Sequence, residues 1–225
     1  MPSDRLTFIQ KDLTELSSKT IAERLIAALV KHDGAPYPEF PPHHQYYSEA
    51  PKPASVLIPI MKIDGDWHLL LTRRNANLPE HSGQVAFPGG RADQEDESPE
   101  ATALREAWEE IGIYPNDVTI LGRLHNFLTI TNYLVTPIVA EIPWPYKFTP
   151  AVEEVSRIFS IPLKWLSDHT NCELRHRQLP GSQELVSVFY FKEYDGEVLW
   201  GASARFTIAL IQALFSDRPG TGQEW

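Results

Sequence analysis

Apolar and polar residues follow one another along the chain in patterns that predict both strands and helices. Two segments rich in Val, Ile and Leu, at 55–63 and 67–73, flank Asp64-Gly65 and predict a β-hairpin, because Asp-Gly favours a tight turn. Similar patterns predict strands at 84–87, 118–128, 133–142, 158–161 and 185–191, and helices at 5–31, 99–111 and 202–215. Strands and helices do not alternate strictly, so we expect an α+β architecture around a mixed or largely antiparallel sheet.

The beginning of the chain differs in composition from the rest. After the helix predicted at 5–31, the segment 34–54 contains six prolines, which exclude a regular helix or a central strand. We therefore expect an N-terminal helix with a proline-rich arm at 1–53 and a main domain at 54–225. No glycine-rich loop follows a strand in the pattern of a Rossmann or P-loop site.

Composition and charge narrow the classes of function. The chain has 225 residues, is 42% hydrophobic and carries a net charge of −10, which supports a folded core and argues against a broad nucleic-acid-binding face. No apolar stretch approaches the ~18 residues of a membrane span, and the charged first residues do not resemble a signal peptide. The single cysteine, Cys172, excludes an internal disulfide. We expect a cytoplasmic protein that binds a small molecule, and leave open whether it forms a homodimer.

The helix predicted at 99–111 has clear ends and an acidic face. Ser98 suits the N-cap, Pro99 the first helical position, and Gly112 the position after the last turn. At about 100° per residue, one face carries the apolar residues Leu104, Ala107, Trp108 and Ile111. The opposite face carries three acids: Glu106, Glu109 and Glu110.

Three carboxylates at this spacing repel one another, and the helix dipole disfavours anions in the last turn. A divalent cation would neutralise them, and oxygen ligands select hard cations such as Mg²⁺, Mn²⁺ or Ca²⁺. The alternative is a solvated acidic face. Gly89-Gly90, shortly before the helix, favours the metal site, because glycine allows the backbone to approach a metal or a phosphate closely.

This part of the sequence resembles the signature of the Nudix hydrolases, G-x5-E-x7-R-E-U-x-E-E-x-G-U, in which U is a bulky apolar residue. The matching positions are Glu97, Arg105, Glu106, Glu109, Glu110, Gly112 and Ile113. Two features depart from the signature: six residues separate Gly90 from Glu97, and Ala107 is small.

The longer spacing is similar to that of the coenzyme A pyrophosphatase branch, which also carries the upstream element L-L-T-x-R-[SA]-x3-R-x3-G-x3-F-P-G-G. The matching positions are Leu70, Leu71, Thr72, Arg74, Gly83, Phe87, Pro88, Gly89 and Gly90. Asn75 replaces the expected Ser or Ala, and Pro79 replaces the second Arg. Proline offers no donor to a phosphate, so this change bears directly on the substrate.

The resemblance implies a Nudix-type α/β/α sandwich around a mixed sheet, here with an extra N-terminal helix. It implies metal-dependent hydrolysis of the pyrophosphate bond of coenzyme A or its acyl derivatives, giving adenosine 3′,5′-bisphosphate and 4′-phosphopantetheine. The alternatives are a Nudix hydrolase for another nucleoside diphosphate derivative, such as ADP-ribose or a nucleotide sugar, and a Nudix-like binding module without catalysis.

The resemblance also implies roles for individual residues. The expected ligands of Mg²⁺ or Mn²⁺ are Glu106, Glu109, Glu110 and the carbonyl of Gly89. The expected catalytic residues are Glu106, Glu109 and Arg105, with the general base left open among the three glutamates and a loop carboxylate, Glu153 or Glu154. For Arg105 we expect chiefly a structural ion pair that, with Glu97, organises the loop against the helix.

The expected substrate-binding residues are Arg74, His81 and Gln84. Arg73 and Arg74 are neighbours in a predicted strand, so only one of them should face the site. Arg205 is either a phosphate contact or a surface arginine. Four tryptophans are expected mostly in the core, with one able to stack on adenine: Trp108, Trp144, Trp165 and Trp200.

Overall fold

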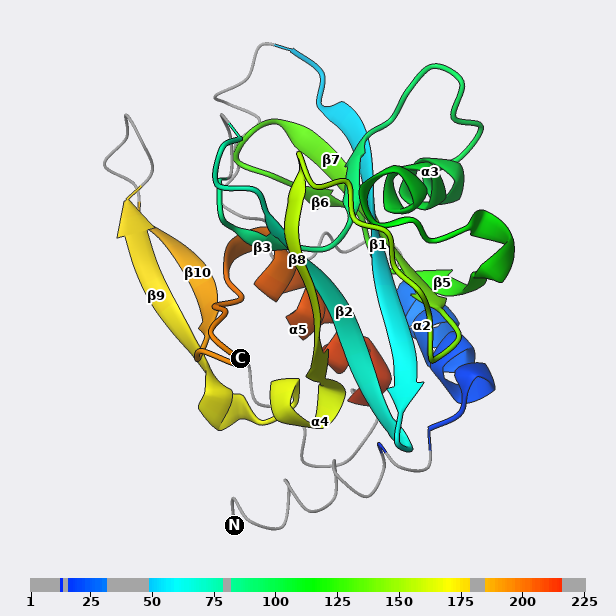
Figure 1. Ribbon diagram of the computed structural model, residues 1–225. Coiled ribbons are helices and arrows are strands. Elements are labelled where there is room, and N and C mark those ends of the chain that lie inside the picture. Colours follow the sequence, from blue (N-terminus) through cyan, green and yellow to red (C-terminus); the bar gives the residue numbers. More distant parts are fainter. Residues whose placement is uncertain (1–12, 14–15, 32–48, 79–81, 179–184, 216–225) are drawn as a thin grey trace.

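The computed structural model describes residues 13, 16–31, 49–78, 82–178 and 185–215 (Figure 1). One mixed sheet contains eight strands with the central order β3-β2-β1-β7-β5. Its strands are β1 (Lys52–Ile63), β2 (Asp66–Arg74), β3 (Val85–Ala86), β4 (Gly89–Arg91), β5 (Thr119–Arg123), β6 (Phe127–Leu128), β7 (Tyr133–Glu141) and β8 (Val155–Pro162). β1 and β7 are parallel, and the other pairs are antiparallel, so the mixed sheet is confirmed.

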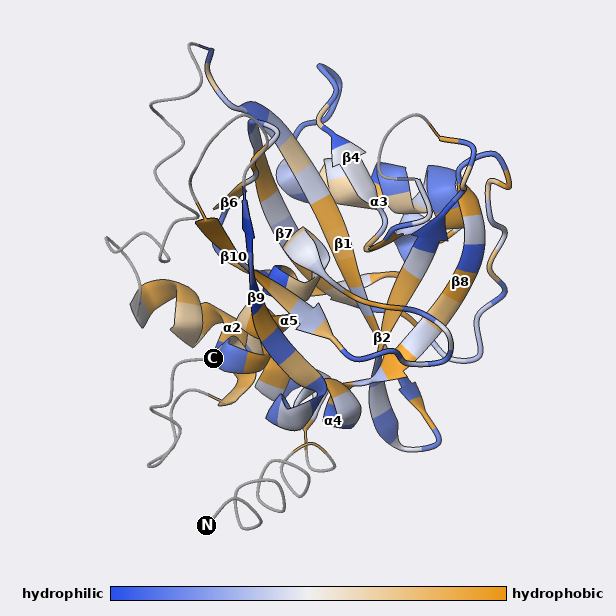
Figure 2. Cartoon of the chain, turned by 90° about the vertical axis from the view of Figure 1, so that its left-hand side faces the viewer, coloured by the Kyte–Doolittle hydropathy of each residue, from blue (hydrophilic) through white to orange (hydrophobic). Residues whose placement is uncertain are grey.

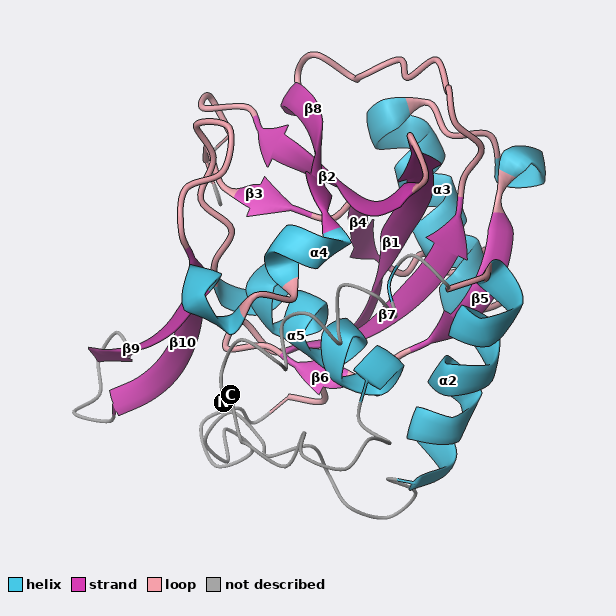
Figure 3. Cartoon of the chain, turned by 90° about the horizontal axis from the view of Figure 1, so that it is seen from below, coloured by secondary structure: helices cyan, strands magenta, loops and turns pink. Residues whose placement is uncertain are grey.

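Helices cover both faces of this sheet (Figure 3). The helices are α2 (Ser18–Lys31), α3 (Pro99–Ile111), α4 (Leu163–Leu166) and α5 (Gly201–Phe215), with 3-10 turns at Pro115–Asp117 and His169–Asn171. Two further strands, β9 (Cys172–Gln178) and β10 (Leu185–Phe191), form a separate two-stranded sheet. Among the described residues, no helix has the length and apolar character needed to cross a membrane.

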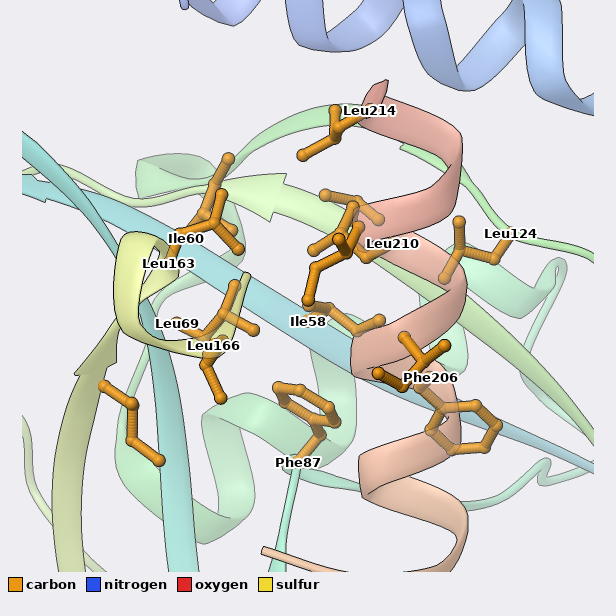
Figure 4. Close-up of a cluster of buried hydrophobic side chains, with 14 of the residues drawn as sticks. Ile58, Ile60, Leu69, Phe87, Leu124, Leu163, Leu166, Phe206, Leu210 and Leu214 are labelled. Atoms are coloured by element: carbon orange, nitrogen blue, oxygen red, sulfur yellow. The ribbon is translucent and has the colours of Figure 1, made fainter. Parts of the chain in front are cut away.

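The alternation of side chains along β1 builds two cores. Ile58 and Ile60 point to a cluster that α5 and α4 close from one side (Figure 4). Leu57 and Met61 point to the other face, where they pack beneath α3. Because both faces of the central strands are buried under helices, the expected α/β/α sandwich is confirmed.

The helix expected at 5–31 is not continuous, because Leu16 and Ser17 are not helical. Ser17 caps the following helix: its Oγ accepts a hydrogen bond from the backbone N–H of Thr20 at 3.1 Å. The carbonyl of Leu16 accepts a hydrogen bond from Trp67 Nε1 at 3.0 Å, which fixes the break against the hairpin. Residues 5–12, 14 and 15 of the expected helix lie outside the described residues.

α2 packs directly on the main sheet. Its residues Ile21 and Leu25 are fully buried in the same cluster as β1 and α5. Gly122 of β5 allows the close approach, since a Cβ there would lie 3.1 Å from Cβ of Leu25. The strand expected at 118–128 is therefore interrupted: it bulges between Ile120 and Gly122, and its two parts, β5 and β6, pair separately with β7.

Other strand predictions agree with the structure except in one region. The hairpin around Asp64-Gly65, the strands at 84–87, 133–142 and 158–161, and the helix at 202–215 are confirmed within a few residues. β9 was not expected, because its sequence, CELRHRQ, lacks an apolar alternation. It forms by pairing with β10 along its whole length.

Candidate active site under the acidic helix

α3 begins and ends where the sequence predicts. Ser98 Oγ accepts a hydrogen bond from the N–H of Ala101 at 3.1 Å, and Pro99 occupies the first turn. Gly112 has φ 72°, a left-handed conformation that suits glycine, and its N–H donates to Trp108 O at 2.9 Å. Local sequence chemistry thus defines the helix that carries the acidic residues.

The expected division of α3 into an apolar and an acidic face is wrong for two residues. Glu110 is buried, with 5% exposure, whereas Trp108 is 50% exposed. The helix contacts the sheet through Ala103, Ala107 and Ile111, all fully buried. Because Ala103 and Ala107 are small, this side of α3 can approach the sheet closely. Glu110 lies next to this contact and is therefore buried with it.

Arg74 meets Glu110 at the end of β2. Its Nη1 lies 3.8 Å from Glu110 Oε1, while Arg73 points to the opposite face and lies 3.5 Å from Glu197 Oε1. The expectation that only one of these arginines faces the acidic helix is confirmed. Arg74 Nε is buried without a hydrogen-bond partner among the described residues, so the guanidinium retains donor capacity.

Burial dominates the electrostatics of Glu110. Desolvation by burial, the largest cause, and repulsion by the nearby Glu106 and Glu154 together raise the pKa of its carboxyl to about 8. The positive charge of Arg74 and a hydrogen bond from the Gly89 N–H oppose this shift. The sequence groups Glu110 with the other acids, but only the structure shows that its negative charge is poorly compensated.

Glu106 lies against the glycine turn. A Cβ on Gly90 would come within 2.6 Å of the Glu106 carboxylate, so a side chain at this position would displace that carboxylate. A Cβ on Gly89 would instead lie 2.4 Å from the carbonyl oxygen of Ser55 on β1. The first glycine therefore fits β4 against β1, and the second makes room for a carboxylate.

Burial also raises the pKa of Glu106, against the lowering effect of Arg105. Glu109 and Glu154 add to the upward shift through charge repulsion. Glu154 thus acts electrostatically on both Glu106 and Glu110, and its carbonyl accepts a hydrogen bond from the N–H of Asn75 at 2.7 Å. Of the two loop acids considered, Glu154 is the one coupled to these carboxylates.

Arg105 holds the preceding loop against α3. Its Nε and Nη2 donate to the two carboxylate oxygens of Asp96 at 3.1 and 2.9 Å, and Nη2 also reaches Arg91 O at 3.1 Å. This two-pronged contact is the largest cause that lowers the pKa of Asp96 to about 2. The expected structural ion pair is found, but Asp96 makes it, and Glu97 is exposed.

The remaining donors of Arg105 engage two of the expected metal ligands. Nη1 lies 2.9 Å from Glu106 Oε1 and 3.1 Å from Glu109 Oε2. Within the part of the chain that the structure describes, no three His, Cys, Asp or Glu side chains converge to hold a metal ion. The oxygen donors nevertheless fit a hard divalent cation in their chemistry.

Of the other two expected substrate-binding residues, Gln84 is among the described residues and lies next to Arg74. The carbonyl of Gln84 accepts a hydrogen bond from the N–H of Arg74 at 2.9 Å, so the two residues are neighbours across β2 and β3. His81 and Pro79 lie outside the described residues. Asn75 donates from Nδ2 to Val152 O at 2.8 Å, which ties the end of β2 to the loop that carries Glu154.

The tryptophans are less buried than expected. Trp144, like Trp108, is an exposed residue, with 46% exposure. Trp165 packs against the larger core, and Trp200 lies partly buried beside β10. None of them contacts the carboxylates of α3 in a hydrogen bond or ring interaction among the described residues.

The profile of the NUDIX domain matches residues 51–179, more than half of the chain. The chain belongs to the NUDIX domain family. The protein named "Uncharacterized Nudix hydrolase NudL" of Yersinia pestis (strain Pestoides F) is 40% identical over 172 residues, which span 76% of this chain and 83% of that protein. A protein of the same name in Yersinia pseudotuberculosis serotype O:1b (strain IP 31758) matches to the same extent. The chain is thus a Nudix hydrolase.

Solved structures of Nudix proteins also match. A binary complex of an Ap4A hydrolase of C. elegans is 23% identical and covers 49% of this chain and 80% of its own, with a TM-score of 0.43. The NUDIX domain of Shewanella oneidensis NrtR, complexed with ADP ribose, is 21% identical and covers 60% and 82%, with a TM-score of 0.40.

Proposed function

We propose that this Nudix hydrolase cleaves the pyrophosphate bond of coenzyme A or its acyl derivatives. The products would be adenosine 3′,5′-bisphosphate and 4′-phosphopantetheine. The observation that carries the proposal is the position of Arg74, the chemically active residue of the upstream element, 3.8 Å from the buried Glu110. A guanidinium at the edge of an acidic site suits a substrate that combines phosphate with a divalent cation.

Most other positions of the upstream element support the fold. Leu70, Leu71 and Phe87 are buried, and Thr72 donates from Oγ1 to Ala86 O at 3.1 Å, which secures β3. These residues hold the strand end and the glycine turn on either side of the carboxylates. Their combined effect is to place Arg74 and the Gly89-Gly90 turn beside α3.

Glu106, Glu109, Glu110 and the Gly89 carbonyl are the proposed ligands of Mg²⁺ or Mn²⁺. Such an ion would neutralise the pyrophosphate oxygens and lower the pKa of the attacking water. Arg74, whose side chain is 28% exposed, would bind and orient a phosphate of the diphosphate through its guanidinium group. Arg105 would keep the loop and the helix together while the substrate binds.

We propose Glu154 as the general base. It lies on the loop that faces α3, is exposed, and interacts electrostatically with both Glu106 and Glu110. An exposed carboxylate can accept a proton from water and release it to solvent. The plot of hydrolysis rate against pH for a Glu154→Gln variant should lack the decrease at low pH that the wild type shows. An unchanged plot would assign the general base to one of the helix glutamates.

The test is a substrate screen with identification of products by mass. Purified protein with Mg²⁺ or Mn²⁺ should convert coenzyme A into the two products named above. Turnover of ADP-ribose or a nucleotide sugar, with coenzyme A left intact, would replace the proposal by a Nudix hydrolase of another substrate, consistent with Pro79 in place of an arginine. Binding of these ligands without turnover of any of them would indicate a binding module.

A further inference from the structure

The β9–β10 hairpin presents a cationic and aromatic face outside the acidic site. β9 is mostly hydrophilic and lies beside the main sheet on the side away from α3 (Figures 1 and 2). Its register places Arg175 opposite Val188 and Arg177 opposite Val186. Alternation along the strands puts both arginines on the same face as Tyr190, where Trp200 packs against the hairpin.

The rings on this face form a platform for the guanidinium groups. Tyr190 and Trp200 stack with their centroids 5.4 Å apart and their planes 5° from parallel. Cζ of Arg177 lies 5.1 Å from the Trp200 centroid and 5.9 Å from that of Tyr190, and Cζ of Arg175 lies 4.4 Å over Tyr190. A guanidinium held on aromatic rings keeps its N–H donors available at its edge, where an oxyanion can bind.

The two arginines differ in how their charges are compensated. Arg175 is paired with Glu173, whose Oε1 lies 2.5 Å from Arg175 Nε. Arg177 is exposed, and no carboxylate of the described residues pairs with it. In a chain of net charge −10, a positioned guanidinium without an acidic partner is a feature suited to an external anion.

The hairpin is anchored to the strand that leads to the acidic site. Glu197, in the segment between β10 and α5, lies 3.5 Å from Nη1 of Arg73 and 3.1 Å from Nη1 of Arg157. Arg73 directly precedes Arg74, and Trp200 follows Glu197 by three residues. The base of the cationic face and the proposed diphosphate contact are therefore fixed to the same end of β2.

We infer that Arg177, held on Tyr190 and Trp200, binds a phosphomonoester of the substrate that is separate from the cleaved pyrophosphate. The inference rests on the proposed function and specifies the substrate class: a nucleoside diphosphate derivative with an additional phosphate on its ribose. Coenzyme A has this phosphate, whereas dephospho-coenzyme A, which is otherwise identical, lacks it. Arg177 would therefore contribute to the choice of substrate and would take no part in cleavage of the pyrophosphate bond.

Steady-state kinetics with these two substrates tests the inference. Arg177→Gln should raise KM for coenzyme A by about tenfold, the loss of one charged contact, and leave kcat and the kinetics with dephospho-coenzyme A unchanged. The control is Arg123→Gln, because Arg123 is an exposed arginine on β5, at the far edge of the main sheet. Equal effects of Arg177→Gln on both substrates, or no effect on either, would overturn the inference.

Calorimetry separates this inference from the proposed function. If neither substrate is hydrolysed, the proposed function fails, but binding can still be compared for adenosine 3′,5′-bisphosphate and adenosine 5′-monophosphate. The wild type should prefer the bisphosphate, and Arg177→Gln should remove that preference. A preference that survives the substitution would contradict the role of Arg177, as would Arg177-dependent binding of an RNA oligonucleotide without binding of the bisphosphate.

Discussion

Glu110 and Asp96 are two carboxylates that α3 holds in opposite electrostatic states. Asp96 receives two hydrogen bonds from Arg105, and its pKa falls to about 2. Glu110 has its nearest guanidinium at 3.8 Å, and burial raises its pKa to about 8. Direct two-pronged contact with a cation dominates for the less buried Asp96, whereas desolvation dominates for the more deeply buried Glu110, whose nearest cation is nearly one ångström farther away.

This comparison separates the part of the site that has a structural role from the part proposed to react. The pair of Asp96 and Arg105 joins the loop to the helix and needs no further partner. Glu110 and the neighbouring, partly buried Glu106 lie where the protein disfavours their ionised forms, which raises the pKa of both carboxyls. A bound cation would favour the ionised forms of these two carboxyls, which connects the packing of α3 to the proposed metal site.

The largest effect is expected for Glu110→Gln. Loss of a carboxylate from the acidic site should lower kcat by about a hundredfold or more, because the reacting groups lose their alignment. The measurement is turnover under saturating Mg²⁺, with Glu100→Gln in the first turn of the same helix as the control. A Glu110→Gln enzyme with wild-type kcat would remove Glu110 from the site.

The pH dependence of stability should show the same contrast. The folded-state pKa of Glu110 lies above its ordinary value of 4.5. The contribution of Glu110 to the free energy of unfolding is therefore fully present below pH 4.5 and is lost as pH rises through about 8. In EDTA, the free energy of unfolding should therefore fall by up to about 1.4 kcal/mol per pH unit between these values. Denaturant titrations of the wild type and Glu110→Gln check this, because the slope due to Glu110 should vanish in the variant.

Asp96→Asn should destabilise the fold by about 2 kcal/mol at neutral pH, since Arg105 loses its charged partner. The pKa of Asp96 is lowered, so its contribution is present above its ordinary value of 3.8 and disappears as pH falls through about 2. Asp93→Asn is a matched control, because Asp93 is exposed and lies 3.8 Å from Arg105. Equal losses in the two variants would show that the paired geometry of Asp96 has no special importance.

A smaller effect is expected from Arg74→Gln. This variant should lower kcat/KM by about tenfold through weaker phosphate binding and leave the melting temperature nearly unchanged. Arg73→Gln breaks the contact with Glu197 on the opposite face and should leave kcat unchanged. If Arg73→Gln lowered turnover and Arg74→Gln did not, the substrate would bind on the face of β2 that carries Arg73.

The sequence predicts the ends of α3 because they depend on local chemistry at Ser98, Pro99 and Gly112. It does not predict which side of the helix is buried. Average hydrophobicity places Trp108 inward, but the small side chain of Ala107 allows the closest approach to the sheet and brings Glu110 inward with it. Helix orientation is a property of packing, which residue spacing alone does not specify.

Loop geometry limits the prediction of the site in a similar way. Matching by spacing selects Glu97 as the partner of Arg105, while the turn before α3 presents Asp96 instead. The alternation of Arg73 and Arg74 was predictable because a strand has a fixed side-chain period. The cationic face of β9 was not, since it requires the pairing of β9 with β10 and the approach of Trp200.

The most direct test of the account is a calorimetric titration of Mn²⁺ into the protein in the presence of a nonhydrolysable diphosphate analogue. The account predicts saturable binding by the wild type that is lost in Glu110→Gln and retained in Asp93→Asn. Absence of binding by the wild type, or equal binding by Glu110→Gln, would contradict the claim that the buried carboxylate of α3 helps to hold a divalent cation.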